Sequence, residues 1–387
     1  MTGGADADGV RIALVSDTYT PQVNGVTTVV RRIATTLQRA GTPVAVVAPR
    51  YPEGGASWGE LRIPSVPFPP YPSIRLSLPR RAIVFDFLDR FAPDLVHVAT
   101  EGPLGLVGRR YALDRNLPLV TSYHTDFPRY TRDYGVPMLA PLVWRWLTRF
   151  HRPARLVQTP GTAVRDELVR RGLRNTVVWG RGVDSRHFHP TRRDLSWRRW
   201  LGGADDAVVV LHVGRLAAEK NLRVMAQAWT RARAALGPFV SFVIAGDGPA
   251  SGMLATHVPF ARRLGFIDRD SLATLYASAD LCVLPSRTET CGLVALEAMA
   301  SGLPVVAADA GGLRESVRHD ATGLLVDPDD WRGIADAIVA LACDGERRRT
   351  MGIAARALAE ERDETIEDAE LLRQYQALTV KDVSCAA

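Results

Sequence analysis

Lysine is nearly missing from this chain. Only Lys220 and Lys381 occur among its 48 basic residues, so the other 46 are arginines. A lysine where arginine is the rule indicates a position that needs a compact charge on a flexible stem. The first half has few acidic residues: residues 1–194 carry 27 Arg against 16 Asp and Glu, whereas residues 195–387 carry 21 basic and 26 acidic residues. The excess of +11 in the first half predicts an anionic partner, which is nucleic acid, an anionic lipid surface or a phosphorylated substrate.

Cysteine is also scarce. The four cysteines lack the spacing of metal ligands, so we expect a reducing cytoplasm and no zinc site. No apolar run approaches the length of a membrane span, and the first ten residues show no charged-then-apolar signal pattern. Signatures of helix-turn-helix, zinc-finger and RNP modules are missing, so we expect no nucleic acid partner.

At 387 residues the chain is long enough for two domains. A short apolar strand at Arg11–Ser16, an amphipathic helix ending at Gly41 and a strand at Val44–Pro49 form a βαβ unit, which is typical of a parallel sheet. Further strands and helices extend it, and we predict a first Rossmann-like, doubly wound domain over residues 1–190. The Pro-rich residues 51–80 indicate a long surface loop, and Asp184–Trp197 indicates a linker.

Strands and helices alternate again after this break. Apolar runs at Val208–Leu216, Phe242–Gly246, Ala279–Pro285, Pro304–Asp309 and Gly323–Pro328 are separated by helical patterns. We therefore predict a second Rossmann-like, parallel α/β domain over residues 191–362. Residues 363–387 have helical apolar spacing, and we expect this helix to pack back on the N-terminal domain.

The most informative stretch is TETCGLVALEAMASG, Thr288–Gly302. It follows an apolar strand, and its spacing predicts a loop carrying Glu289 and a helix carrying Glu297 in its second turn. A helix start has unpaired N–H groups and a partial positive charge, and Gly292 lets an anion approach them closely. Glu297 could accept hydrogen bonds from vicinal hydroxyls such as a ribose diol, while Glu289 would face what lies beyond the phosphates. Two solvated glutamates remain the alternative interpretation.

Two cationic residues follow the first strand of the second domain, in GRLAAEKN. Arg215 can bind a pyrophosphate bidentately, and Lys220 adds a second positive charge. Both could contact the ligand of the glutamate motif, because the ends of parallel strands open on one crevice. In the first domain, Gly25 at a helix start is a second candidate anion site. The loop GDGPASG, Gly246–Gly252, is a poor dinucleotide fingerprint, and we interpret it as a tight turn.

His124 and Asp126 follow the predicted strand Pro118–His124 at its carboxyl end. A neutral histidine can donate a hydrogen bond to a developing charge or a hydroxyl, and Asp126 could orient it. The next segment is an aromatic and basic helix, which either rests on an anionic membrane or buries its tryptophans in a core; its aromatic residues are Trp144, Trp146 and Phe150, and its basic residues are Arg145, Arg149 and Arg152.

With these motifs, PQVNGVTTVVRRIATTL, SYHTDFPRY, WGRGVDSRHFHP, VGRLAAEKN, IAGDGP and TETCGLVALEAMASGLPVVA, nearly the whole chain resembles retaining glycosyltransferases of the GT-B fold, family 4. Cys291 is a departure, because family members commonly have Phe before the glycine. The resemblance implies two Rossmann-like domains facing across a cleft. It also implies transfer of a hexosyl group, of mannosyl or glucosyl type, from a nucleotide-diphosphate sugar to a lipid or glycan acceptor. No metal or other cofactor is expected.

The resemblance further implies a role for each motif residue. Arg215 and Lys220 hold the diphosphate, Glu297 binds the ribose, and Glu289 binds the donor sugar. His124 lies by the 6-hydroxyl or the anomeric side of that sugar. The backbone near Gly25 and near the second helix start assists the diphosphate, and the base lies at Phe266 and Ile267; the second helix start comprises Gly292, Leu293 and Val294.

Within the family, PQVNGVT, YHTDFPRYTRDYG and WGRGVD are most similar to GDP-mannose-dependent mannosyltransferases and sulfoquinovosyl-diacylglycerol synthases. Both groups act on lipids at the cytoplasmic membrane face, so the resemblance implies peripheral contact with an anionic membrane. Sulfoquinovosyl transfer to diacylglycerol and a non-catalytic nucleotide-sugar or lipid binder remain alternatives. A nicotinamide-dependent oxidoreductase is disfavoured, because neither domain has Gly-x-Gly-x-x-Gly after its first strand.

Overall fold

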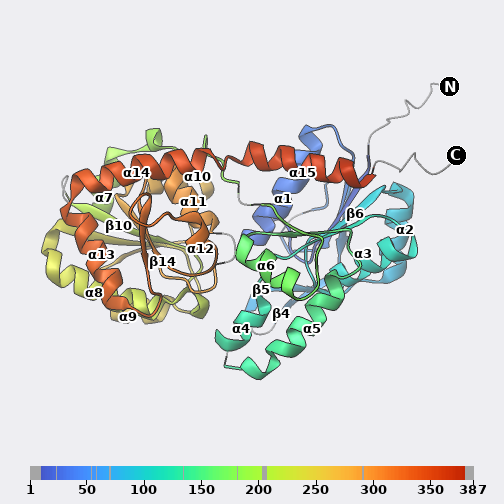
Figure 1. Ribbon diagram of the computed structural model, residues 1–387, viewed down its shortest axis with the longest axis horizontal. Helices are drawn as coiled ribbons and strands as arrows, with labels where there is room; N and C mark the ends of the chain where they lie inside the picture. Colours follow the sequence, from blue (N-terminus) through green and yellow to red (C-terminus); the bar gives the residue numbers. More distant parts are fainter. Residues whose placement is uncertain are drawn as a thin grey trace. The chain divides into compact units, whose positions relative to one another are not determined.

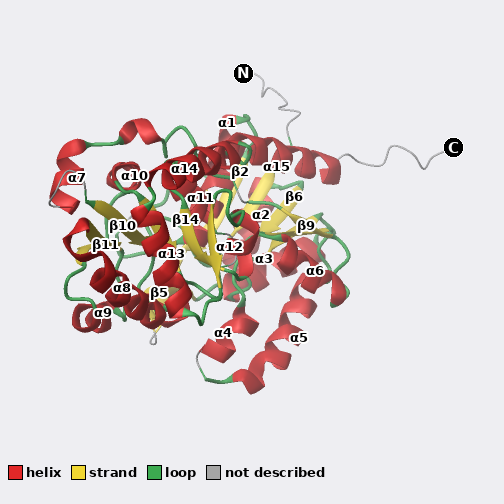
Figure 2. Cartoon of the chain, turned by 60° about the vertical axis from the view of Figure 1, so that its left-hand side comes forward, coloured by secondary structure: helices red, strands yellow, loops and turns green. Residues whose placement is uncertain are grey.

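The chain forms two compact units in a computed structural model that describes residues 10–22, 24–53, 55–57, 59–68, 71–133, 135–180, 182–202, 207–289 and 292–379. The first unit comprises Met1–Thr125, Leu139–Gly180 and Asp368–Ala387; the second comprises Asp126–Met138 and Arg181–Glu367. Each unit is built on a parallel sheet with helices on its faces (Figures 1 and 2). The predicted fold of two Rossmann-like α/β domains is confirmed.

Seven strands form the sheet in the described part of the first unit, in the order β3-β2-β1-β6-β7-β8-β9. All their pairings are parallel, and the central strands are fully buried. The order reverses at β1, which pairs with β2 on one side and β6 on the other. The strands are β1 (Ile12–Val15), β2 (Val44–Pro49), β3 (Glu60–Ile63), β6 (Leu95–Val98), β7 (Leu119–Ser122), β8 (Leu156–Thr159) and β9 (Thr176–Val178).

The helices of the first unit bury one apolar face each. In α1, Asn24 caps the start by accepting a hydrogen bond from Thr27 N at 2.8 Å, and Val30, Ile33 and Leu37 are fully buried at helical spacing. The helices are α1 (Gly25–Arg39), α2 (Arg81–Phe91), α3 (Pro103–Asp114), α5 (Ala140–His151) and α6 (Thr162–Arg170), with α15 (Glu364–Thr379) joining the unit from Asp368 onward.

Residues 51–80 are not the irregular loop that their prolines predict. β3 pairs in parallel with β2 at the edge of the sheet, and β4 (Ser65–Phe68) pairs antiparallel with β5 (Tyr71–Ser77). Proline cannot donate to a ladder, but edge strands leave half of their N–H groups outside it, so Pro67 is tolerated in β4. The prediction was wrong because composition does not reveal pairing between distant segments.

The second unit contains a sheet of six described strands in the order β12-β11-β10-β13-β14-β15. All are parallel, and two buried apolar clusters cover the two faces. The first strand of the unit, β10, lies between β11 and β13, so the order reverses there. The strands are β10 (Val208–Val213), β11 (Val240–Ala245), β12 (Arg262–Gly265), β13 (Leu281–Leu284), β14 (Val305–Ala308) and β15 (Gly323–Val326).

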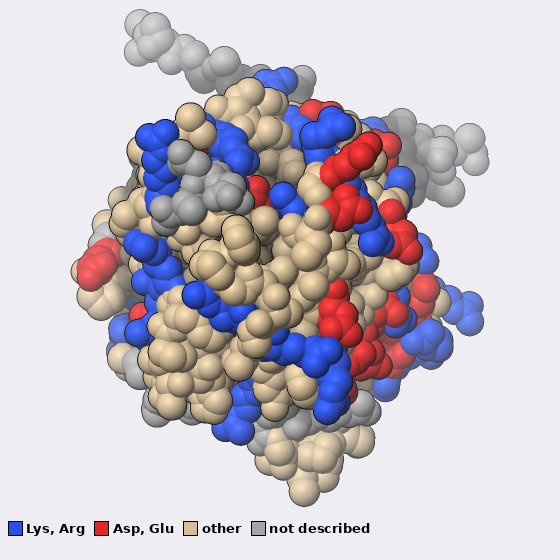
Figure 3. All heavy atoms as spheres, turned by 90° about the vertical axis from the view of Figure 1, so that its left-hand side faces the viewer, with Lys and Arg blue, Asp and Glu red and all other residues tan. Residues whose placement is uncertain are grey.

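Its helices follow the strands in alternation. They are α7 (Leu195–Gly202), α8 (Leu222–Leu236), α9 (Ser251–His257), α10 (Arg269–Ser278), α11 (Leu293–Ala300), α12 (Gly311–Ser316), α13 (Trp331–Cys343) and α14 (Gly345–Glu360), together with α4 (Phe127–Asp133). Short 3₁₀ turns are η1 (Pro137–Leu139), η2 (Pro190–Arg192), η3 (Ala218–Lys220) and η4 (Gly237–Phe239). The face shown in Figure 3 carries basic and acidic side chains.

The stretch Asp184–Trp197, which the sequence suggests as a linker, is packed on the second unit. Phe188 is buried, and the Arg356 guanidinium donates to the carbonyls of Ser185 and Phe188 at 2.8 and 2.9 Å. Two of its main-chain carbonyls are therefore bonded to α14 of the same unit.

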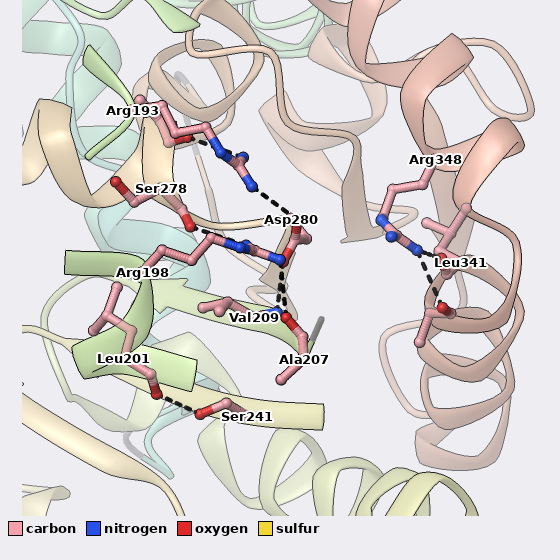
Figure 4. Close-up of polar contacts among 12 residues, drawn as sticks. Arg193, Arg198, Leu201, Ala207, Val209, Ser241, Ser278, Asp280, Leu341 and Arg348 are labelled. Carbon is pink, nitrogen blue, oxygen red and sulfur yellow. Dashed lines mark hydrogen bonds and ion pairs between the residues drawn. The ribbon is translucent and has the colours of Figure 1, made fainter. Parts of the chain in front are cut away.

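An ion pair holds α7 to the sheet (Figure 4). The Arg198 guanidinium donates to Asp280 Oδ2 at 2.7 Å and to the carbonyls of Ser278 and Ala207 at 3.3 and 2.9 Å. The same carboxylate oxygen accepts a hydrogen bond from Val209 N at 2.8 Å. Both charged side chains are only 11% exposed. A charge buried this far depends on its partner.

The last described helix, α15, bonds to the sheet of the first unit through buried polar groups. The Tyr375 hydroxyl lies 2.5 Å from His97 Nδ1, and Gln374 accepts a hydrogen bond from Gln158 at 2.8 Å. Burial lowers the pKa of His97 to about 3, so this histidine is neutral. Over the described residues, no helix combines the length and apolarity needed to cross a bilayer.

Candidate active site

The carboxyl end of β10 is the switch point of the second unit, and most predicted site residues follow it or its neighbour β13. Ligands of parallel sheets lie at such a point because the loops after the two strands diverge to opposite faces. The loop after β10 leads through Arg215 to η3, which ends at Lys220. The loop after β13 leads to Glu289 and α11.

Backbone packs on backbone beneath this point. A Cβ on Gly246 would lie 1.9 Å from Gly214 O, and one on Gly311 would lie 2.5 Å from Glu289 O. Both glycines also have positive φ, so a side chain at either position is disfavoured by backbone conformation as well as by lack of space. Gly312 N also donates to Glu289 O at 2.6 Å. Main-chain packing therefore joins the loop after β10 to the loop after β11, and the loop after β13 to the loop after β14. The tight turn predicted within Gly246–Gly252 is confirmed, because Ser251 N donates to Gly248 O at 3.0 Å.

The structure brings two of the predicted site residues, Lys220 and Glu289, into direct contact. Lys220 Nζ donates to Glu289 Oε2 at 2.5 Å, and their side chains are 21% and 19% exposed. Arg215 forms an ion pair with Glu219, whose side chain is buried while that of Arg215 is 42% exposed. The Thr288 hydroxyl donates to Glu219 O at 3.3 Å and so ties the two loops together.

The start of α11 has the geometry expected for binding an anion. Gly292 adopts the left-handed conformation at φ 71°, and Leu293 and Val294 begin the helix. A Cβ on Gly292 would lie 2.9 Å from Ser316 Oγ, so glycine is needed for space as well as conformation. Ala295 N and Leu296 N donate to Gly292 O at 2.9 and 3.1 Å, whereas helix geometry gives the N–H groups of Leu293 and Val294 no acceptor within the helix. Cys291 lies outside the described residues.

Glu297 lies in the second turn of α11, as predicted. Tyr276 of α10 donates from its hydroxyl to Glu297 Oε2 at 3.3 Å. Burial raises the pKa of the Glu297 carboxyl to about 7, although the Tyr276 hydrogen bond and the Arg269 charge oppose this shift. This carboxyl can therefore be protonated or ionised close to neutral pH.

Phe266 and Ile267 follow β12, two strands from β10. The Phe266 side chain is 67% exposed, whereas Ile267 packs against the apolar cluster of its face. Gly265 O accepts a hydrogen bond from Gly246 N at 2.8 Å, which fixes the end of β12 to the loop after β11. A large exposed ring held on a fixed strand end offers a flat surface for stacking.

In the first unit, Gly25 begins α1 behind its Asn24 cap, and His124 follows β7. Burial lowers the pKa of His124 to about 4, and the nearby His151 adds to this shift, so His124 is neutral at pH 7. Asp126 Oδ1 accepts a hydrogen bond from Arg129 N at 3.1 Å at the start of α4. Asp126 is grouped with the second unit and His124 with the first.

The sequence analysis missed a buried polar cluster under His124. His151 Nδ1 lies 2.8 Å from Thr121 Oγ1, and His151 Nε2 lies 3.3 Å from Glu101 Oε1; all three side chains are buried. Thr121 lies in β7, His151 in α5 and Glu101 in the loop before α3, so only tertiary structure brings them together.

Two further residues at the switch point were missed. Asn221, at φ 56°, donates to the carbonyls of Pro285 and Pro328 at 3.2 and 2.6 Å and so joins the ends of β13 and β15. His212, buried in β10, lies with Nδ1 2.9 Å from Val283 O; because a carbonyl only accepts, Nδ1 carries the proton. A histidine inside the apolar run VVVLHV was a visible signal.

Comparisons with known proteins agree with this geometry. Residues 23–187 match the model described as Glycosyltransferase Family 4, and residues 207–344 match that described as Glycosyl transferases group 1. A GDP-mannose-dependent alpha-mannosyltransferase of Mycobacterium tuberculosis is 35% identical over 98% of this chain and all of its own length. This chain belongs to glycosyltransferase family 4.

Other relatives of this family 4 glycosyltransferase include the GDP-mannose-dependent alpha-mannosyltransferase of Mycolicibacterium smegmatis, 36% identical over 95% of this chain and 98% of the relative. A sulfoquinovosyl transferase of Arabidopsis thaliana is 35% identical over 77% of this chain and 59% of the relative. Among solved structures, Anabaena HepE in complex with UDP has a TM-score of 0.72 at 22% identity over 95% of this chain and all of its own. This likeness shows that the glycosyltransferase has the GT-B fold, as predicted.

Proposed function

We propose that the protein transfers a mannosyl or similar hexosyl group from a nucleotide-diphosphate sugar to a lipid or glycan, with retention at the anomeric carbon and without a metal. The observation that carries the proposal is the meeting of Lys220, Glu289 and the α11 start at the switch point. Two mycobacterial relatives that match nearly the whole chain are named for GDP-mannose, which makes GDP-mannose the first donor to test.

Each site group has one task in this proposal. Arg215 and Lys220 bind the diphosphate, and the N–H groups at Gly292, Leu293 and Val294 bind it from the helix start. Gly25 offers the equivalent helix start of the first unit. Glu297 accepts from the ribose hydroxyls, Glu289 accepts from the sugar hydroxyls, and the base stacks at Phe266 and Ile267.

In the reaction, the bond from the anomeric carbon to the diphosphate breaks while the acceptor oxygen bonds to the same face of the sugar. The acceptor proton passes to the departing phosphate oxygen, so the step needs no carboxylate nucleophile. The cations and the positive end of α11 stabilise the charge that develops on the diphosphate, which is why no metal is required. Neutral His124 donates a hydrogen bond near the reacting carbon, with Asp126 as its orienting partner.

A donor screen tests the proposal. Purified protein is incubated with GDP-mannose, UDP-glucose, UDP-sulfoquinovose or NADH, with lipid extract as acceptor and with or without EDTA. We expect a glycolipid product and thermal stabilisation with one nucleotide sugar, unchanged by EDTA, and loss of product in Glu289→Ala. Product lost on adding EDTA would contradict the metal-free proposal. Product from UDP-sulfoquinovose alone would favour the second candidate, which the Arabidopsis relative suggests. Binding without product under every acceptor would favour a non-catalytic binder.

We also propose that α5 rests on the inner face of the cell membrane, which would make this a peripheral cytoplasmic enzyme. Leu139, Leu142 and Trp146 share one face of the α5 segment and are 45%, 64% and 38% exposed. Arg145 and Arg149 are exposed beside them. An apolar stripe flanked by arginines suits the boundary of an anionic bilayer.

The rest of α5 belongs to the core. Phe150 is buried, and Trp144 stacks on Tyr123 with ring centroids 6.3 Å apart and also lies under the Arg171 guanidinium. Sedimentation with anionic liposomes tests whether the exposed face of α5 binds a membrane. Leu142→Ser should reduce the bound fraction several-fold without changing the melting temperature, because it alters only the exposed stripe. Equal sedimentation of Leu142→Ser and wild type would contradict the membrane proposal.

A further inference from the structure

The ion pair between Lys220 and Glu289 joins two residues that the proposed function assigns to different parts of one donor. Lys220 is assigned to the diphosphate and Glu289 to the sugar, yet the 2.5 Å contact makes each the partner of the other. A diphosphate oxygen and the Glu289 carboxylate are both anions that can bind the same ammonium group. The two therefore compete for Lys220.

The backbone of each residue in this pair is hydrogen-bonded to a neighbouring segment, so we expect rotation of the side chains and not movement of the loops. Glu289 O accepts from Gly312 N at 2.6 Å, and Lys220 N donates to Ala217 O at 3.0 Å. Asn221, next to Lys220, bonds to the ends of β13 and β15. A lysine side chain has a flexible four-carbon stem, which lets its ammonium turn from one anion to another without loop movement. This flexibility gives a physical reason for lysine at position 220 in a chain that otherwise uses arginine.

We propose, resting on the proposed function, that Glu289 is a resident counter-ion that makes the site favour sugar-bearing donors over bare nucleoside diphosphates. Any diphosphate must take Lys220 away from Glu289. A donor compensates, because its sugar hydroxyls give the released carboxylate new hydrogen bonds. A nucleoside diphosphate has no sugar, so it leaves a partly buried carboxylate without its partner, which is unfavourable. After transfer, Glu289 pairs again with Lys220 and promotes release of the nucleoside diphosphate.

Calorimetry with the full-length protein tests this competition. The probes are GDP, UDP and inorganic pyrophosphate, none of which carries a sugar, and the isosteric variant is Glu289→Gln. We expect Glu289→Gln to bind whichever diphosphate binds wild type about tenfold more tightly, because nothing then competes for Lys220. Glu289→Ala should show the same direction, which guards against an effect peculiar to glutamine. Weaker or unchanged affinity in both variants would overturn the inference.

Two controls separate pairing from general repulsion between anions. Asp327→Asn removes a negative charge that follows β15 at the same edge of the sheet and whose Oδ1 accepts from Asp329 N at 2.8 Å, with no bond to Lys220, and it should leave pyrophosphate affinity within twofold of wild type. Glu289→Gln made in a Lys220→Ala background should give no gain, because the two changes act through one contact. A tenfold gain that persists without Lys220 would mean that Glu289 merely repels phosphate, and the inference would be wrong.

The same titrations distinguish this inference from the proposed function. If GDP, UDP and pyrophosphate fail to bind both wild type and Glu289→Gln, the site does not bind diphosphates, and the proposed function falls with the inference. If they bind wild type and Glu289→Gln equally, the proposed function stands and only the counter-ion role is removed. Product inhibition gives an independent measure: Glu289→Asp, if active, should change the inhibition constant for nucleoside diphosphate more than KM for the donor.

Discussion

The raised pKa of Glu297 predicts a pH-dependent cost of keeping this carboxylate in the folded protein. Burial raises its pKa from 4.5 to about 7. Between these two values the folded chain holds a proton that the unfolded chain has lost, so stability falls as pH rises through this window. The cost of the ionised carboxylate is therefore zero below pH 4.5 and reaches about 3 kcal/mol above pH 7. Glutamine does not titrate, so Glu297→Gln removes this dependence.

Thermal unfolding of wild type and Glu297→Gln at matched pH values measures the effect. The difference in Tm should be near zero at pH 4.5 and should reach about 6–12 °C in favour of the variant at pH 8.5, taking about 2–4 °C per kcal/mol for a unit of this size. Comparison at each pH cancels the other titrating groups. Tyr276→Phe provides a second test: its hydroxyl lowers the Glu297 pKa, so its removal should extend the window to higher pH. A Tm difference that does not vary with pH would refute the reasoning.

Three other predictions concern the second unit. Arg198→Ala should lower the free energy of unfolding by about 3 kcal/mol, because it leaves Asp280 buried without its main partner. Arg193 lies 3.8 Å from the same carboxylate but is 42% exposed, so Arg193→Ala should cost less than about 1 kcal/mol. Chemical denaturation of the two variants compares these losses. Gly292→Ala should lower the free energy of unfolding by about 1–2 kcal/mol, because Gly292 has a positive φ and lies close to the Ser316 hydroxyl. Gly252 lies in a helix with nothing within 4 Å of an added Cβ, so Gly252→Ala should not destabilise the protein. Equal losses of stability in the two variants would exclude a conformational cause. Lys220→Ala should raise the donor Kd about 10- to 100-fold in calorimetry by removing a charge-assisted contact worth about 1.5–3 kcal/mol, and unchanged binding would remove Lys220 from the site.

Much of the fold follows from local patterns. The strand over Val44–Pro49 has the predicted bounds, and Glu289 and Glu297 lie in the predicted loop and second helical turn. These features depend on periodicity and on glycine within one short stretch, so the sequence contains their cause. Residues 51–80 show the opposite case: β3 exists because β2 offers an edge, and a neighbour in space leaves no local pattern.

The candidate site divides in the same way. Lys220 and Glu289 were predicted to share a ligand because strand ends of a parallel sheet converge, and they are in contact. Tyr276 was not foreseen, because its hydrogen bond to Glu297 depends on how α10 packs against α11. The roles of His124 and Asp126 stay predictions, since their meaning depends on a bound substrate. Resemblance assigns such roles, and packing alone does not.

The glycines beneath the switch point limit which positions of this enzyme tolerate substitution. Substitution at Gly246 or Gly311 would push a carbon into the main chain of a neighbouring loop, so these positions are closed to change. Phe266 projects two-thirds exposed from the end of a fixed strand, where a new side chain meets solvent instead of backbone. Under the proposed function, in which the base stacks at Phe266 and Ile267, a library aimed at a different nucleotide should randomise these two positions and leave the glycines untouched. The rigid main chain would keep the diphosphate groups in register while the recognition surface evolves.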